Sequence, residues 1–222
     1  YRIAIPQTGV YKIDAAFLTG LGFSAPVSSA QIRLYGNGGK MLAESNRSPR
    51  ADDLLENAIL MEDGGDGNFS GTDYFLFYAG GPDEWIPDSL NKRFSHRKNL
   101  YSGESYYYIT IGGSGKRINP QNPQPPSNTL VDQFDEHYFH ELDTLNFLSS
   151  GKQWYGEEFS NSPGRVSFRE FSISFTGLLP GTPVTVTSDV IARSVGQASR
   201  FDVRLNNIPL FEHVLQPLPG IL

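Results

Sequence analysis

The stretch LYGNGGKMLAE, residues 34–44, separates two classes of fold. Its glycines, Gly36, Gly38 and Gly39, belong either to a phosphate-binding loop or to a turn between two strands. A phosphate-binding loop requires a buried parallel strand before the glycines and a helix after them, because the free N–H groups of the helix N-terminus bind the anion. A turn instead predicts an antiparallel β protein.

The residues on both sides of the glycines favour the turn. Apolar and polar residues alternate over residues 31–35, which is typical of a half-exposed strand rather than a buried parallel one. After the glycines only Lys40–Glu44 could begin a helix, and the serines, asparagine and proline that follow would end it early. Asn37-Gly38 is a dipeptide that supplies two positive-φ residues to a type I′ turn. We therefore expect a β-hairpin at this position.

The composition excludes several classes of function. A chain of 222 residues with 38% hydrophobic residues is apolar enough to bury a core. The net charge of −6 and the scattered Lys and Arg residues give no basic patch for nucleic acid, and no apolar run approaches the roughly 18 residues that cross a bilayer. The absence of cysteine excludes disulfides and a cysteine nucleophile from this segment. Because Tyr1–Pro6 does not resemble a signal peptide, we expect an internal part of a longer chain.

A proline-rich stretch near the middle predicts two domains. Residues 119–128, NPQNPQPPSN, contain four prolines and no large apolar residue, which is typical of an extended, solvated linker. We expect an N-terminal β domain with one short helix over residues 1–118. Residues 129–222 should form a second, jelly-roll-like β-sandwich, incomplete at its C-terminus because QPLPGIL adds no closing strand.

Short apolar runs predict an all-β, mainly antiparallel fold of two β-sandwich-like domains with at most one or two short helices. Asp14 is the expected N-cap of the helix. The run at 74–78 is apolar on both faces and should be central in its sheet, and GGPDEWIPD, residues 80–88, should be a rigid loop. Residues 131–148 combine a helical apolar stripe with a β-rich composition, and both alternatives stay open. The expected strands are 3–5, 9–13, 58–61, 74–78, 106–111, 171–175, 184–187 and 201–205.

Two groups of polar residues resemble metal sites. His137 and His140 are three residues apart, whereas the helical zinc motif requires four-residue spacing, so surface histidines are favoured over a metal site. Residues 62–73 contain oxygen ligands suited to calcium, but the EF-hand template places Phe77 where a bidentate glutamate belongs. An irregular calcium site and a turn whose carboxylates bind their own backbone both stay open. The calcium candidates are Asp63, Asp66, Asn68 and Asp73; no other metal or cofactor is predicted.

The sequence contains no catalytic constellation. No serine lies in a Gly-x-Ser-x-Gly pattern, and the adjacent Glu157 and Glu158 would point apart on a strand rather than form a glycosidase pair. The remaining candidates are aromatic. Trp85, Trp154 and Tyr155 are binding candidates because exposed aromatic faces can stack on sugar rings, and core packing is the alternative.

Five stretches occur in an order that resembles one protein family. They resemble the N-terminal region of the type IX secretion system sortases of Bacteroidetes, which are gingipain-like cysteine peptidases of the C25 class. The resemblance continues past the proline-rich linker. The stretches are GVYKIDAAFLTGLGFS, IRLYGNGGKMLAE, RADDLLENAILMEDGGDGNFSGTDYFLFYAGGPDEW, FSHRKNLYSGESYYYITIGG and FHELDTLNFLSSGKQWYGEEF.

The resemblance implies secreted relatives held at the outer membrane. In them a downstream domain with a Cys–His pair removes C-terminal sorting signals and joins cargo to surface polysaccharide. None of those catalytic residues maps onto this chain, which has no cysteine. The implied role is a non-catalytic module at the cell surface that packs on the peptidase domain of the same chain and docks secreted cargo or an outer-membrane β-barrel protein. The alternative is a surface carbohydrate-binding or adhesion module.

Overall fold

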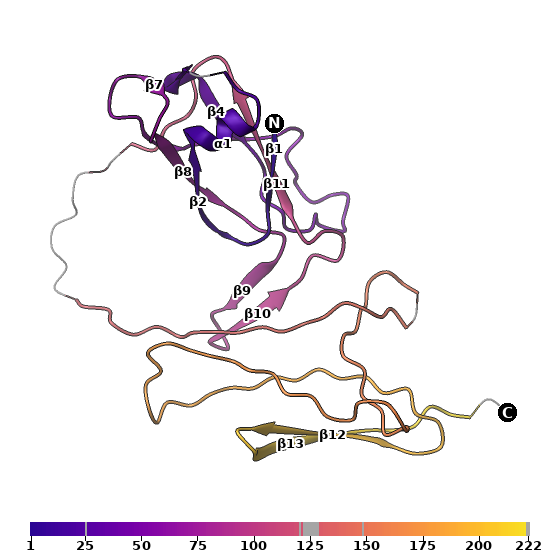
Figure 1. The fold of residues 1–222 in the computed structure, drawn as a ribbon. Helices are drawn as coiled ribbons and strands as arrows, with labels where there is room; N and C mark the ends of the chain where they lie inside the picture. The colour runs from indigo at the N-terminus through magenta and orange to yellow at the C-terminus, as the bar shows by residue number, and fades with distance from the viewer. Residues whose placement is uncertain (25, 120, 122–128, 148, 221–222) are drawn as a thin grey trace. The chain divides into compact units, whose positions relative to one another are not determined.

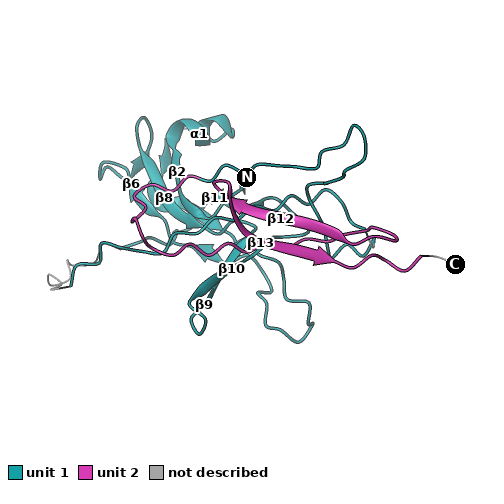
Figure 2. Ribbon diagram, turned by 90° about the horizontal axis from the view of Figure 1, so that it is seen from below, with its two compact units in different colours: residues 1–173 teal, residues 174–222 magenta. Residues whose placement is uncertain are grey.

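Antiparallel ladders make up all of the pairing between named strands, which confirms the predicted all-β class. The computed structural model describes residues 1–222 except 25, 120, 122–128, 148 and 221–222 (Figure 1). Contacts divide the chain into two compact units, Tyr1–Ile173 and Ser174–Leu222, which Figure 2 colours separately. The predicted linker lies almost entirely outside the described residues, so the boundary placed there stays a prediction.

The first sheet of the N-terminal unit has the strand order β1-β11-β4-β5. Its three longer strands alternate in burial, as half-exposed strands do, so that every second side chain enters the core. The buried set includes Ile5, Leu34 and Ile109. The strands are β1 (Arg2–Ile5), β4 (Ile32–Tyr35), β5 (Glu56–Asn57) and β11 (Ser105–Ile111).

The second sheet has the order β2-β8-β6, and β8 is central, as its apolar sequence predicted. Phe75 and Phe77 on β8 are buried, and the Phe77 ring lies 5.7 Å from the ring of Tyr107 in the first sheet. The expected strand at 58–61 is instead divided, since residues 56–57 pair in the first sheet and residues 60–62 in the second. The strands are β2 (Gly9–Asp14), β6 (Leu60–Glu62) and β8 (Tyr74–Ala79); β3 (Val27–Ser28) pairs separately with β7 (Asn68–Phe69).

One short α-helix, α1 (Ala15–Gly20), covers part of the core (Figure 1). Asp14 caps it as predicted, because its carboxylate accepts a hydrogen bond of 2.8 Å from the Phe17 amide. Leu18 is the buried anchor of the helix. A 3-10 turn, η1 (Ser29–Gln31), precedes β4.

The prediction of a rigid loop at residues 80–88 is partly wrong, because Glu84–Asp88 is a strand. This strand, β9, pairs with β10 (Arg93–Arg97) to form a hairpin, with Trp85 opposite His96. The Asp88 carboxylate accepts hydrogen bonds from the backbone and side-chain amides of Asn91, which hold the turn. A proline in β9 is tolerated because the sheet has only two strands, so one side of each needs no ladder partner.

The type I′ turn predicted at Asn37-Gly38 is also wrong. Only Gly38 has positive φ, at 78°, and β4 pairs with β5 only after the long segment 36–55. The Asn37 side chain instead bonds to the backbone of Asp53 and Leu55, which fixes this segment as a loop.

A two-residue turn with two positive-φ residues occurs at the other end of the chain. It joins β12 (Ser199–Leu205) to β13 (Ile208–Leu215), the only paired strands among the described residues of the C-terminal unit. Asn206 and Asn207 form it with φ of 47° and 69°, as a type I′ turn requires. The strand predicted at 201–205 is therefore confirmed, and its partner was not foreseen.

Several expected elements are absent from the second half of the chain. The described part of 131–148 contains no helix, and no strand is assigned over 171–175 or 184–187. The buried residues all lie between Ile3 and Ile109; every described residue after Ile109 is at least partly exposed. Alternation identifies the apolar face of a segment, but a ladder also needs a neighbour in register.

Replacing Gly36 tests how closely the glycine loop packs on the core. A Cβ there would lie 2.5 Å from the Tyr107 ring, whereas a Cβ at Gly103 would have no neighbour within 4 Å. We expect Gly36→Ala to lower the free energy of unfolding by about 1–3 kcal/mol, because the buried ring must shift. Gly103→Ala is the control and should be nearly neutral. Urea denaturation of both variants checks this, and equal midpoints would contradict the close packing.

Candidate interaction site

Trp85 on β9 is the centre of a cluster of aromatic and histidine rings. Its ring lies 4.7 Å from that of His96 on β10 and 4.1 Å from that of His137, with Phe139 at 6.1 Å. Residues 137–143, here called the strap, run past the β9–β10 hairpin as an irregular segment (Figure 1). The cluster therefore joins the hairpin to a segment beyond the predicted linker.

His96 has a side chain that is mostly covered within this cluster. Its side chain is only 8% exposed, and the Phe139 ring stacks on it at 3.7 Å. Its Nε2 lies 3.9 Å from an Asp83 oxygen, and its Nδ1 has no hydrogen-bond partner in the described part of the chain. Burial lowers the pKa of His96, and the Asp83 carboxylate opposes this only in part. The neutral imidazole is therefore the form that suits the folded state.

Charged groups hold the strap beside the end of the hairpin. Lys98 Nζ lies 2.9 Å from an Asp143 carboxylate oxygen and donates a second hydrogen bond of 3.1 Å to the Glu141 carbonyl. Burial raises the pKa of the Glu141 carboxyl, and the neighbouring Asp143 adds to the effect. One lysine thus contacts two strap residues, and this polar contact complements the ring cluster.

The outer side of the cluster is a partly exposed aromatic surface. Phe94 stacks on His137 at 4.8 Å and is 46% exposed, and Trp85 is 37% exposed. We call Trp85, Phe94 and His137 the hairpin patch. Glu84 beside it forms ion pairs with Arg97 and, at 3.5 Å, with Lys40; the hydrogen bond from Arg97 lowers the pKa of Glu84. Aromatic side chains with paired charges around them are typical of protein contact surfaces.

The other predicted binding residues, Trp154 and Tyr155, lie elsewhere. Tyr155 exchanges backbone hydrogen bonds with Leu145 and packs on Phe147 at 5.5 Å. The Trp154 indole donates to the Gly151 carbonyl at 3.3 Å. Within the described residues neither contacts Trp85, so the three candidates do not form one site.

His137 and His140 also have different partners. His137 joins the Trp85 cluster, whereas His140 Nε2 lies 2.5 Å from a Glu157 oxygen. Burial tends to raise the pKa of Glu157, but the His140 ring and a backbone amide outweigh it and lower the pKa. The two histidines therefore do not converge on one point.

The calcium candidates bind their own backbone. Asp63, Asp66 and Asp73 accept hydrogen bonds of 2.8–3.0 Å from nearby amides, and Asn68 donates one of the amides. The Ser29 hydroxyl and the Gly65 amide lower the pKa of Asp63. Across the described ranges no three His, Asp or Glu side chains are placed to hold a metal. Calcium binding stays a prediction without a formed cage.

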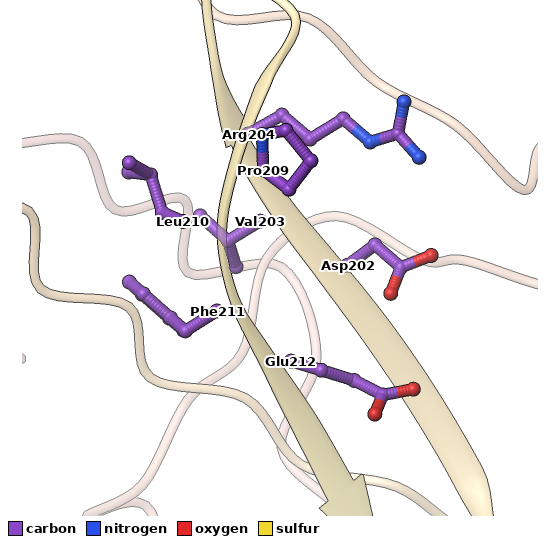
Figure 3. A pocket seen from close by; sticks show the side chains of 7 residues that line it. All are labelled: Asp202, Val203, Arg204, Pro209, Leu210, Phe211 and Glu212. Atoms are coloured by element: carbon purple, nitrogen blue, oxygen red, sulfur yellow. The ribbon is translucent and has the colours of Figure 1, made fainter.

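A hollow on the β12–β13 ribbon is shallow and chemically mixed. Figure 3 shows Asp202 and Glu212 pointing to one side of the ribbon and Phe211 to the other. Glu212 is already paired with Arg200 at 2.8 Å. The lining has no convergent set of polar groups that would orient a ligand.

The contacts around Trp85 suit binding rather than catalysis. The cluster has no nucleophile beside a base, and the cysteine-free sequence supplies no thiolate. Sequence reasoning found Trp85 but missed His96, Lys98 and Phe139. For His96 a signal existed, since residues 93–97 follow the mostly polar turn at 89–92 that separates them from β9, whereas no local signal could place Phe139. In the part of the chain described here, no helix is long and apolar enough to span a bilayer.

No family model matches the chain, and no curated protein matches it either. Among solved structures, the chain is similar to a crystal structure of dimeric latent PorU from Porphyromonas gingivalis, with 25% sequence identity and a TM-score of 0.48. The match covers 64% of this chain and 12% of that chain. The chain therefore matches a small part of the length of that protein.

The burial of His96 predicts a pH dependence of stability. Because its pKa is lowered by folding, the unfolded chain binds more protons than the folded chain near and below the ordinary histidine pKa of about 6.5. The free energy of unfolding should therefore fall as the pH is lowered from about 7.5 to about 5.5. Urea denaturation followed by tryptophan fluorescence measures this.

His96→Phe is the matched variant, because it keeps a ring between Trp85 and Phe139 but cannot be protonated. It should show a smaller loss of stability on acidification than the natural chain. The raised pKa of Glu141 should increase stability on acidification, but Glu141 is present in both proteins. Asp83, Lys98 and His137, which also act on His96, are unchanged as well. The difference between the two pH profiles therefore isolates the contribution of His96. Identical pH profiles would show that folding does not lower the pKa of His96.

Proposed function

We propose that the chain is the non-catalytic N-terminal β region of a secreted, gingipain-like cysteine peptidase that resembles the type IX secretion sortases. It would act at the cell surface, pack on the peptidase domain and dock secreted cargo or an outer-membrane partner. The observation that carries this proposal is the ordered set of sequence stretches between residues 9 and 159. Their order and spacing are more specific than any single motif.

The fold supports the proposal because these stretches coincide with elements that pack together. The first contains β2, the third contains β8, and the fourth contains most of β10 and all of β11. The fifth lies beyond the linker and contains Phe139 and Asp143 of the strap, which contact His96 and Lys98 of the fourth. Two of the stretches that carry the resemblance are therefore in contact in the folded chain, in addition to occurring in the same order in the sequence.

The hairpin patch is the surface we assign to docking. Trp85 and Phe94 are partly exposed aromatic side chains on a two-stranded hairpin, and both of its outer strand edges are unpaired among the described residues. Aromatic anchors carry much of the binding energy of protein interfaces, and free strand edges can accept an extended peptide. Because the chain has no cysteine, any peptide cleavage must depend on residues outside it.

The native coding region tests the proposal most directly. A βα-patterned domain beyond Leu222, with a His and then a Cys placed to pair, is the expected result. Repeated β modules or an immediate stop would overturn the peptidase assignment. Glycan binding through the aromatic residues would then become the leading function.

In the full-length protein, Trp85→Ala should weaken capture of cargo or of the outer-membrane partner by about tenfold or more, since it removes a central aromatic anchor. Leu90→Ala is the matched control, because Leu90 is a 90% exposed apolar residue in the turn of the same hairpin. Pull-down and sorting assays measure the effect. Peptide cleavage by the isolated peptidase domain should not depend on either residue. Equal capture by both variants would exclude the hairpin patch as the docking surface.

A further inference from the structure

A second, chemically different surface lies beside the glycine loop. A hollow of about 440 Å³ is bounded by the loop after β4, by β5 and by the end of β8. This volume is within the range of about 300–1,000 Å³ that is typical of small-ligand sites. It contains none of the residues of the hairpin patch.

The floor of the hollow consists of glycine backbone and one tyrosine hydroxyl. A Cβ at Gly36 would overlap the Tyr107 ring, so the loop lies directly on that ring. A Cβ at Gly80 would lie 3.7 Å from Gly38 and 3.9 Å from the Tyr107 hydroxyl, which is ordinary contact distance. The floor is therefore open at Gly80, where a side chain would fit but none is present, and at Gly38, whose φ of 78° favours glycine.

The Tyr107 hydroxyl is a donor without an acceptor. Tyr107 is only 3% exposed, and its oxygen accepts a hydrogen bond of 2.9 Å from the Gly80 amide. Within the residues that the structure describes, its own proton has no acceptor. Buried hydroxyl groups generally satisfy their donors, so this one suits a ligand oxygen or a water in the hollow.

Tyr78 is an exposed aromatic residue in the lining of the hollow. It is 65% exposed, although its neighbours Phe77 and Ala79 on β8 are buried. Its cross-strand neighbour is Val10, which is 69% exposed, and its ring stacks on no other ring in the described chain. An exposed tyrosine ring beside a hollow is a suitable stacking surface for the apolar face of a sugar.

Asn57 and Lys116 provide polar groups in the lining of the hollow. The Asn57 amide nitrogen donates to the carbonyls of Gly36 and Leu55, so its oxygen is oriented as an acceptor. Lys116 Nζ donates to the Glu56 carbonyl at 3.2 Å and has further N–H groups for a ligand.

Glu56 is the only carboxylate in the lining of the hollow, and it is already paired. It accepts hydrogen bonds from Arg33 and from the Lys116 amide, both at 2.8 Å, which lower its pKa. The lining thus has no unpaired negative charge and contains one ammonium group. This balance favours a neutral or acidic ligand over a cationic one.

We propose that the hollow binds a pyranose ring of a neutral or uronic-acid-containing glycan. The apolar ring face stacks on Tyr78, and the sugar hydroxyls accept from Tyr107 and Lys116 and donate to Asn57. A sugar fits better than an extended peptide, because the hollow combines one stacking ring with separate donors and acceptors. The proposal does not depend on the docking function.

Affinity electrophoresis of the 222-residue chain tests this in gels that contain soluble xylan, β-glucan, mannan or polygalacturonate. We expect retardation by at least one of them, and titration with oligosaccharides of that polymer then gives the affinity. Tyr78→Ala should weaken it by about tenfold, because it removes the stacking ring. Gly80→Ala should fold normally but also weaken binding, since its methyl group occupies the floor.

Val10→Ala is the matched control, because it changes the exposed cross-strand neighbour of Tyr78 without altering the hollow. It should bind like the natural chain, and so should Trp85→Ala, because Trp85 does not line the hollow. Absence of retardation by all four polymers would overturn the proposal. Glycan affinity in Tyr78→Ala equal to that of the natural chain would overturn it as well, and so would loss of glycan binding in Trp85→Ala alone. Neither result would affect the docking assay.

Discussion

The packing of Tyr107 is the constraint on which the N-terminal unit depends. Its ring belongs to β11 of the first sheet, contacts Phe77 of the second sheet and lies against Gly36 of the glycine loop. Its hydroxyl binds the Gly80 amide at the end of β8. One side chain therefore fixes the spacing of two sheets and the path of two loops. The glycines of the GNGG sequence therefore allow the loop to lie against the Tyr107 ring, and they form neither a hairpin turn nor a phosphate site.

The hairpin patch depends on a different kind of contact. β9 and β10 form a separate two-stranded sheet, and isolated hairpins have little stability of their own. The hairpin is supported instead by the strap, through the stacking of Phe139 on His96 and the ion pair of Lys98 with Asp143. The exposed rings of Trp85 and Phe94 are thereby held in place without being covered. That combination of support and exposure is what a docking surface requires.

Sequence patterns correctly predicted the elements that depend on neighbouring residues in the chain. Asp14 capped its helix, and β8 was central because its sequence is apolar on both faces. The turn predicted at Asn37-Gly38 does not form, because hydrogen bonds from the Asn37 side chain to the backbone of Asp53 and Leu55 outweigh the turn preference of the dipeptide. Of the site, Trp85 could be found from its residue type, but its partners could not. Phe139 is more than forty residues from His96, and no pattern in the sequence encodes that contact.

The distribution of burial links the fold to the proposed role. The core ends at Ile109, and the later described residues have apolar side chains that are only partly covered. Segments with few buried contacts open at a lower free-energy cost than the core strands. A partner that binds only the folded form would stabilise these segments by mass action. A peptidase domain packed against this half of the chain would therefore contribute most where the chain's own packing contributes least.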